Sequence, residues 1–233
     1  MTHDQSASIR CYIPKNFNVT KVKGYNPRWH DKYHWFIHSI LFKQLTQKDS
    51  FGGYVNLNST VIQKYLGTNY AKTIIDQLIN SKVIDYNKSY SAGAFSKSYR
   101  LAKKYTGKIK TVELRKATYE RKIRKHRDEY LKDVLKENRN AQDELLKLTY
   151  FRIDTTRALE YIQSKYNVNS KEYKARLIAI DQFDNMHRAT FSQGQWNINF
   201  TFKVNKKRIY TPFTMLARDL EQFVYFEGYE GKN

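Results

Sequence analysis

Two amphipathic runs separated by a very short turn constrain the fold of this chain more than any other feature. The first reads "NSTVIQKYL" over residues 58–66 and stops at Gly67, and the second, "YAKTIIDQLINSKVI", begins at Tyr70. Apolar residues at helical spacing predict a helix in each run, and a glycine directly after a helix is a typical stop. The sequence therefore predicts two helices that meet at a tight turn.

A longer helix and a hairpin are predicted on either side of this pair. "RWHDKYHWFIHSILFKQL", from Arg28, places apolar residues on one helical stripe, and "FGGYVNL" after it reads as a short strand. Downstream, Lys82–Asn87 and Phe95–Leu101 have the composition of two strands joined by a loop with Gly93. This order of helix, strand, helix, turn, helix and hairpin resembles the winged-helix family of DNA-binding proteins over residues 28–105.

The resemblance implies that the third helix fits a groove of duplex DNA while the hairpin contacts the flanking backbone. Within the hairpin, "AFSKSYRLAKKY" alternates aromatic and cationic residues, a combination suited to bases and phosphates. A winged helix that mediates protein contacts is the alternative. The expected DNA-binding residues are Thr68, Asn69, Tyr70, Lys72, Thr73, Gln77, Lys88, Lys97, Tyr99, Arg100, Lys103 and Lys104.

The charge of the chain points to a polyanionic partner. Lys and Arg number 42 against 22 acidic residues, which gives a net charge of +20. Self-repulsion of this size destabilises a compact state, so nucleic acid is the simplest explanation, with a basic surface that has no partner as the alternative. Between Lys97 and Arg139 there are 16 cationic and 6 acidic residues, a net charge of 16 − 6 = +10.

These patterns predict an α+β fold that is mostly helical and has four parts. Residues 1–27 are expected to form an arm with one short strand, 28–110 a winged-helix domain, 111–149 a basic linker helix, and 150–233 a small α+β module that closes with a helix at "PFTMLARDLEQFVYFEGYEGKN". A single cysteine, Cys11, excludes a disulfide framework and a cysteine zinc cluster. With no apolar run of membrane-spanning length, we expect a cytoplasmic protein without membrane contacts.

The last third of the chain carries a second resemblance, over residues 150–230. "KKRIYTPFTMLARDLEQFVYFEG" is similar to a segment of replication-type proteins of phages and mobile elements, although Glu221 stands where those proteins have arginine. The resemblance implies a role in replication or transcription of such an element. Two alternatives remain: the N-terminal half of a split polymerase or nuclease, or an RNA-binding or single-strand-binding protein. The matching residues are Arg208, Tyr210, Thr211, Thr214, Leu216, Leu220 and Gly228.

No catalytic or metal site is predicted. His30, His34 and His38 have the i, i+4 spacing at which two imidazoles share a metal, but neither a cysteine nor a suitably placed glutamate accompanies them, so we expect ordinary polar positions. Asp181 and Asp184 have the i, i+3 spacing at which two carboxylates could share a magnesium ion, but we expect them to be ordinary surface carboxylates of a helix. We therefore expect no cofactor and no catalysis by the chain alone. A protein partner is expected at the aromatic residues near the end, Phe223, Tyr225, Phe226 and Tyr229.

Overall fold

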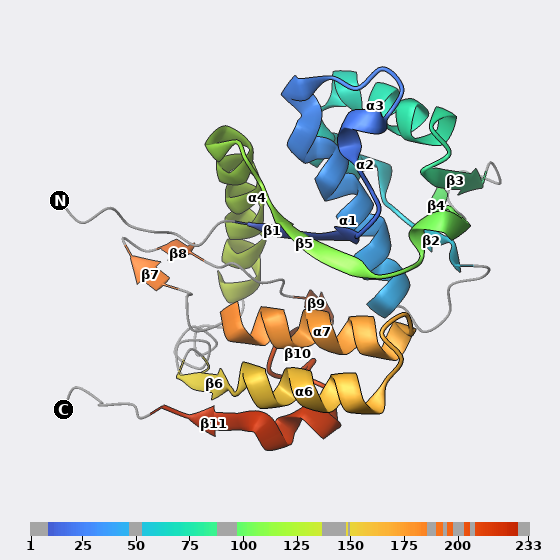
Figure 1. The fold of residues 1–233 in the computed structure, drawn as a ribbon. Helices are drawn as coiled ribbons and strands as arrows, with labels where there is room; N and C mark the ends of the chain where they lie inside the picture. Colours follow the sequence, from blue (N-terminus) through green and yellow to red (C-terminus); the bar gives the residue numbers. More distant parts are fainter. Residues whose placement is uncertain are drawn as a thin grey trace. The chain divides into compact units, whose positions relative to one another are not determined.

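The prediction of an α+β fold is confirmed by a computed structural model of the chain (Figure 1). The structure describes residues 9–46, 53–87, 97–136, 148, 150–185, 190–192, 195–197, 203–205 and 208–227, and every sheet within them is antiparallel. The chain divides into two compact units, an N-terminal unit of residues 10–119 and a C-terminal unit of residues 120–233 together with residues 1–9. Each unit is described below by itself.

The N-terminal unit is built around α1 (His30–Thr46), whose apolar stripe is buried as far as Leu41. Tyr33, Phe36, Ile37 and Ile40 each have no exposed surface, as their helical spacing predicts. The other elements of this unit are β1 (Arg10–Pro14), η1 (Val19–Lys21), η2 (Pro27–Trp29), β2 (Val55–Asn56), α2 (Ser59–Leu66), α3 (Thr68–Asn80), β3 (Ile84–Asn87), β4 (Ser98–Leu101), η4 (Lys103–Tyr105), β5 (Ile109–Glu113) and the start of α4 (Ala117–Lys136).

The turn between α2 and α3 forms as its sequence predicts. The side chain of Asn58 caps α2 by accepting hydrogen bonds from the backbone N–H groups of Thr60 and Val61. Gly67 ends α2 with a φ of +94°, and a Cβ at this position would lie 3.2 Å from the Tyr70 ring. Glycine is therefore favoured by the backbone conformation, and any side chain here would also crowd the Tyr70 ring.

Two sheets hold the N-terminal unit together. The first has the strand order β2-β4-β3, with Tyr99 opposite both Val55 and Tyr86. The second pairs β1 with β5, so that Arg10 lies opposite Glu113 and Pro14 opposite Ile109. This second pairing joins segments about a hundred residues apart in the sequence.

The β1–β5 pairing changes two of the predicted boundaries. The predicted arm of residues 1–27 contains a strand around Cys11–Ile13, as expected, but residues 10–27 belong to the N-terminal unit and bury Phe17, Val19 and Val22. The helix predicted over residues 111–149 begins only at Ala117, because residues 109–113 form β5. Residues 137–147 of that predicted helix lie outside the described residues.

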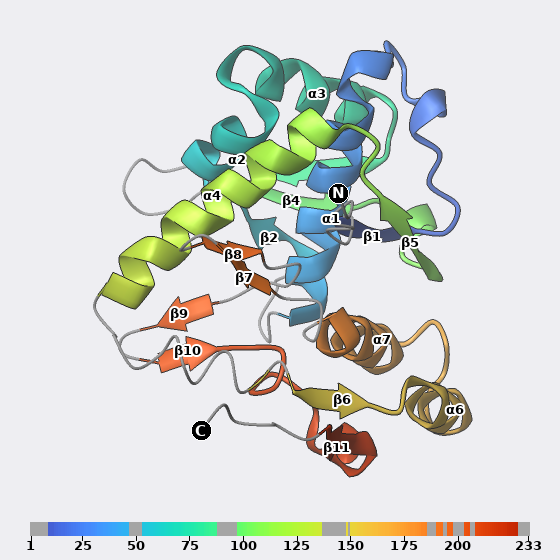
Figure 2. The same cartoon turned by 90° about the vertical axis from the view of Figure 1, so that its left-hand side faces the viewer.

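The C-terminal unit packs α6 (Thr155–Lys165) against α7 (Lys171–Asp184), and Figures 1 and 2 show these two helices side by side. Its core contains Ala158, Ile162, Phe183 and Leu220, none of which has exposed surface. The remaining elements are β6 (Phe151–Ile153), β7 (Thr190–Ser192), β8 (Gln195–Asn197), β9 (Lys203–Asn205), β10 (Arg208–Tyr210), η6 (Arg218–Phe223) and β11 (Val224–Phe226).

The closing helix predicted for this unit is wrong. Residues 218–223 form a 3₁₀ helix, η6, and the chain then extends into β11, which pairs with β6. Leu216, Leu220, Phe223 and Val224 do have helical spacing, but Leu220 is the one residue of η6 that is buried. Val224, Tyr225 and Phe226 are β-branched and aromatic residues that favour a strand.

Candidate nucleic-acid interface and a buried histidine pair

The start of α3 presents most of its predicted DNA-binding residues at the surface. Thr68, Asn69, Lys72 and Thr73 are all exposed. Tyr70 is 44% exposed, and its ring lies 5.3 Å from the Trp29 ring, measured between centroids. The ammonium group of Lys32 lies 4.5 Å from the centroid of the same ring. This end of α3 thus offers polar side chains beside the exposed Tyr70 ring and the half-buried Lys32, whose ammonium also donates to the Leu66 carbonyl.

Gln77, a turn further along α3, has a structural role. Its Oε1 accepts a hydrogen bond of 2.5 Å from the Tyr33 hydroxyl, and its Nε2 donates to the Gly24 carbonyl at 2.5 Å. A Cβ at Gly24 would lie 2.8 Å from the same Nε2, so the segment before α1 fits closely against this side chain. The Gln77 side chain therefore holds this segment in place through both of its polar atoms.

Two residues of β4 differ in their accessibility to a ligand. Tyr99 does not fit the prediction, because it is only 2% exposed, its ring packs edge-on against Phe36, and burial raises its pKa to about 12. Arg100 is partly exposed, and its Nε donates a 2.8 Å hydrogen bond to the Asp85 carboxylate. The hydrogen bond to Asp85 raises the pKa of Arg100. Alternation along the strand thus directs one predicted residue into the core and its neighbour outward.

The three remaining predicted residues that the structure describes, Lys97, Lys103 and Lys104, are exposed. Lys97 precedes β4, whereas Lys103 and Lys104 form the start of η4, and the Lys104 ammonium lies 4.9 Å from the centroid of the Tyr105 ring. Lys88 lies outside the described residues.

A second basic cluster lies around the β1–β5 pair, and Lys104 is its one member among the predicted DNA-binding residues. Lys15 donates its backbone N–H to the Lys108 carbonyl at 2.7 Å, and the Asn16 side chain donates to the Lys104 carbonyl. These bonds bring lysines from both ends of the N-terminal unit together. The exposed cations of this cluster are Lys15, Lys104, Lys108, Lys110 and Arg115. Local sequence could not reveal this cluster, because it depends on a long-range strand pairing.

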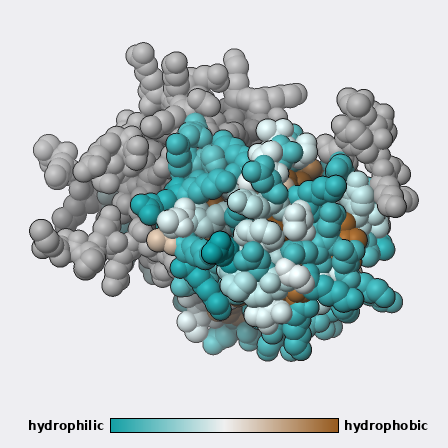
Figure 3. Space-filling view, turned by 90° about the horizontal axis from the view of Figure 1, so that it is seen from above, coloured by the Kyte–Doolittle hydropathy of each residue, from teal (hydrophilic) through white to brown (hydrophobic). Residues whose placement is uncertain are grey.

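The N-terminal unit contains 20 Lys and Arg residues against 5 acidic residues, a net charge of 20 − 5 = +15. Asp31 is buried and accepts hydrogen bonds from the backbone N–H groups of Arg115 and Lys116, which directly precede α4. Asp85 is paired with Arg100. Figure 3, which looks down on the side where α3 lies in Figure 1, shows a face dominated by hydrophilic residues. A strongly positive surface of this kind attracts polyanions.

His30 and His34 meet on one side of α1 instead of taking ordinary polar positions. They are 5% and 7% exposed, and their ring centroids lie 4.5 Å apart. Burial, followed by the charge of Arg115, lowers the pKa of His30, and burial together with the neighbouring His30 lowers the pKa of His34 to about 4. Both rings are therefore neutral at pH 7. His38 is separate, because its Nδ1 accepts the Tyr12 backbone N–H at 3.1 Å.

A pocket of about 440 Å³ adjoins this histidine pair. Phe17 lines this pocket and packs edge-on against His34. Cationic side chains also line the pocket. The polar side chains that line it are Lys15, Asn16, Asn18, Thr20, His30, His34, Lys110 and Arg115.

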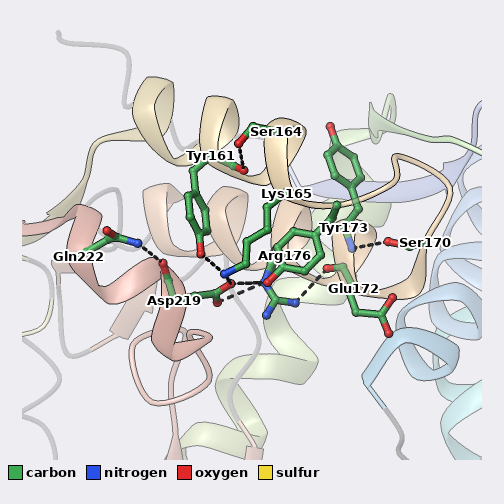
Figure 4. A network of polar contacts seen from close by, with 10 residues as sticks. Tyr161, Ser164, Lys165, Ser170, Glu172, Tyr173, Arg176, Asp219 and Gln222 are labelled. Atoms are coloured by element: carbon green, nitrogen blue, oxygen red, sulfur yellow. Dashed lines mark hydrogen bonds and ion pairs between the residues drawn. The ribbon is translucent and has the colours of Figure 1, made fainter.

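In the C-terminal unit the charged groups near the core pair with one another, as Figure 4 shows. Asp219 accepts hydrogen bonds from Arg176 Nε at 2.9 Å and from the Tyr166 hydroxyl at 2.6 Å, and the Lys165 ammonium lies 4.0 Å away. Burial raises the pKa of Asp219, but the hydrogen bonds from Arg176 and Tyr166 outweigh it and leave this pKa below its usual value. Asp219 thereby links η6 to α6 and α7.

The aromatic residues predicted as a partner surface are partly exposed. Tyr225 is 52% and Phe226 53% exposed, and the Phe226 ring lies 5.3 Å from Phe151, whereas Tyr229 lies outside the described residues. A protein partner at this surface stays a prediction.

Comparison with family models, with curated proteins and with solved structures found no match for this chain. None of the helices in the described part of the chain combines the length and apolar character needed to cross a lipid bilayer. Inferences about function therefore depend on the geometry and charge of the residues above.

Proposed function

We propose that the chain is a DNA-binding protein whose N-terminal unit binds duplex DNA, with α3 in a groove and the neighbouring lysines on the phosphate backbone. The observation that carries the proposal is the net charge of +15 on residues 10–119, two of whose five acidic side chains are engaged internally. Each phosphate neutralised by Lys or Arg releases counterions, and this supplies much of the affinity for nucleic acid.

The arrangement of the elements supports a winged helix. The unit has the order α1, β2, α2, α3, β3, β4, and its sheet has the strand order β2-β4-β3. In a winged helix the third helix is the one that enters the major groove. The exposed residues Asn69, Lys72 and Thr73 on α3 suit this role, because amide and ammonium groups can read base edges.

A role in replication or transcription of a phage or mobile element is the accompanying proposal. It rests on the sequence resemblance of residues 150–230 to replication-type proteins. The described elements of that segment are the helices α6, α7 and η6 and the short strands β6 to β11. The winged-helix arrangement is compatible with this role because initiators and regulators both need a duplex-binding unit.

Fluorescence anisotropy of the full chain with labelled duplexes tests the proposal. Log affinity should fall linearly with log salt, by about 0.9 per neutralised phosphate. Asn69→Ala should change the preference among sites by about 1–3 kcal/mol at particular base pairs, because an amide reads adenine through paired hydrogen bonds. Asn80→Ala is the matched control, since Asn80 is also exposed but lies at the other end of α3. A flat salt dependence would contradict the proposal.

Binding of single-stranded nucleic acid is the second candidate, favoured by Tyr70. Its exposed ring, flanked by Trp29 and Lys32, is a surface on which a base can stack. In that case Tyr70→Ala should weaken single-strand binding by about 1–3 kcal/mol, while Asn69→Ala should leave it unchanged. A duplex reader should give the opposite pattern, so both variants belong in the same set of titrations.

A further inference from the structure

The strongest unassigned feature is the buried group His30, Asp31 and His34 in the N-terminal unit. One nitrogen of each imidazole and one Asp31 oxygen lie within 4.8 Å of one another, and all three side chains are buried. We propose that this group binds a divalent transition metal ion of the zinc class. The proposal does not depend on the proposed DNA binding.

Two unsatisfied nitrogens are the first argument. His30 Nε2 and His34 Nδ1 are both inaccessible to water, and neither has a hydrogen-bond partner. Leaving a buried polar atom unsatisfied costs about 1–3 kcal/mol, so two such atoms on adjacent rings need an explanation. A shared metal ion satisfies both, because a neutral imidazole presents a lone pair on the nitrogen that carries no proton.

The second argument is that His30 Nδ1 and the Asp31 carboxylate already have hydrogen-bond partners. His30 Nδ1 lies 2.8 Å from the Tyr25 hydroxyl, so Nδ1 can carry the proton and leave the Nε2 lone pair free for a metal. Asp31 accepts backbone hydrogen bonds of 2.8 Å from Lys116 and 3.1 Å from Arg115. Metal sites are built in this way, with partners that orient each ligand from behind.

The donor set fits zinc better than the hard cations. Two imidazoles and one carboxylate are a known zinc combination, whereas calcium and magnesium require mostly oxygen ligands. Ligand atoms around a tetrahedral zinc ion lie roughly 3.4 Å apart, so small side-chain rotations would bring the three donors together. Three protein ligands leave a fourth position for water or another small ligand.

Nearby positive charge should lower the affinity of this site for a metal ion. Arg115 and Lys110 line the pocket next to the two histidines, and Lys116 follows Arg115. These cations repel a divalent ion, so we expect affinity that is weaker than that of a four-ligand structural zinc site.

Metal titration of the untagged full chain tests the site. One equivalent of Zn²⁺ should bind, measured by competition with a chromophoric chelator, and Co²⁺ should give the visible absorption of a tetrahedral site. His34→Gln should weaken binding at least tenfold, and His30→Gln combined with His34→Gln should abolish it. His38→Gln is the matched control, one turn further along α1, and should bind as the unmodified chain does. Equal binding by the double variant, or equal loss in His38→Gln, would overturn the proposal.

A measurement on the unmodified chain covers the case in which the variants fail to fold. Zn²⁺ should shift the imidazole ¹⁵N resonances of His30 and His34 and leave those of His38 in place. If Zn²⁺ shifts neither ring, or shifts other histidines only, the proposed site does not exist.

Discussion

The two units of this chain use charge in opposite ways. Residues 10–119 have a net charge of +15, whereas the rest of the chain, with 22 Lys and Arg residues and 17 acidic residues, has 22 − 17 = +5. In the C-terminal unit Arg152 pairs with Glu227, and Arg176 and Lys165 pair with Asp219. The N-terminal unit instead exposes most of its lysines. We therefore propose that the first unit is the one that binds a polyanion, whereas these ion pairs stabilise the second unit.

Phe183→Ala should produce the largest effect. It should lower the stability of the C-terminal unit without changing DNA binding by the N-terminal unit. Phe183 has no exposed surface, and truncating a buried phenylalanine costs about 3–5 kcal/mol. Hydrogen exchange should therefore show faster opening of α6 and α7, while DNA affinity at fixed salt stays unchanged. Loss of DNA affinity in parallel with the opening of the C-terminal unit would show that binding is not confined to residues 10–119.

Removal of three exposed lysines should have the next largest effect. The triple variant Lys97→Ala, Lys103→Ala and Lys104→Ala should weaken duplex binding on the order of 10²-fold at 0.1 M salt and reduce the salt slope by about 2.7. The matched triple variant in the C-terminal unit is Arg157→Ala, Lys171→Ala and Arg218→Ala, whose side chains are also exposed. Anisotropy titrations at several salt concentrations compare the two. Equal losses would abolish the distinction between the units.

Local patterns predicted the parts of the N-terminal unit that local interactions determine. The stripe of α1, the Asn58 cap and the Gly67 stop could all be read from sequence, since each acts within a few residues. The pairing of β1 with β5 could not, because it joins distant segments, and the surrounding basic residues made "IKTVE" look like the start of an exposed helix.

The candidate sites, too, could be predicted from sequence only where local interactions determine them. The exposed residues at the start of α3 follow from helical periodicity. Tyr99 is predicted to contact DNA but is buried against Phe36, and only the packing of the fold shows this. The i, i+4 spacing of His30 and His34 was visible in the sequence. Their burial and their two unpartnered nitrogens depend on β1, β5 and the segment before α1, which only the fold brings together.

Asp219→Asn should have a moderate and pH-dependent effect. Because the folded-state pKa of Asp219 is lowered, the ionised group stabilises the fold above its unfolded-state pKa of 3.8, and this stability is lost as the pH falls through the folded-state value. At pH 7 the substitution should cost about 1.5–3 kcal/mol, the range for hydrogen bonds to a charged group. Urea unfolding should show that the free energy of unfolding of the variant changes less between neutral and acidic pH than that of the unmodified chain. Glu221→Gln, an exposed substitution in the same element, should change neither quantity.

The smallest effects are expected at the Arg100–Asp85 pair. This contact is an ion pair within the N-terminal unit, and it also belongs to the proposed DNA-binding surface. The two side chains are 40% and 41% exposed, so Arg100→Ala should change stability very little, because solvent screens an exposed ion pair. For DNA binding the two residues should act in opposite directions. Arg100→Ala removes a cation and should weaken every duplex slightly and alike, whereas Asp85→Ala removes the competing carboxylate and should strengthen binding. A double-mutant cycle measured by anisotropy gives the coupling between them. If Asp85→Ala also weakens binding, the pair serves to hold the hairpin in shape, and Arg100 contacts no phosphate.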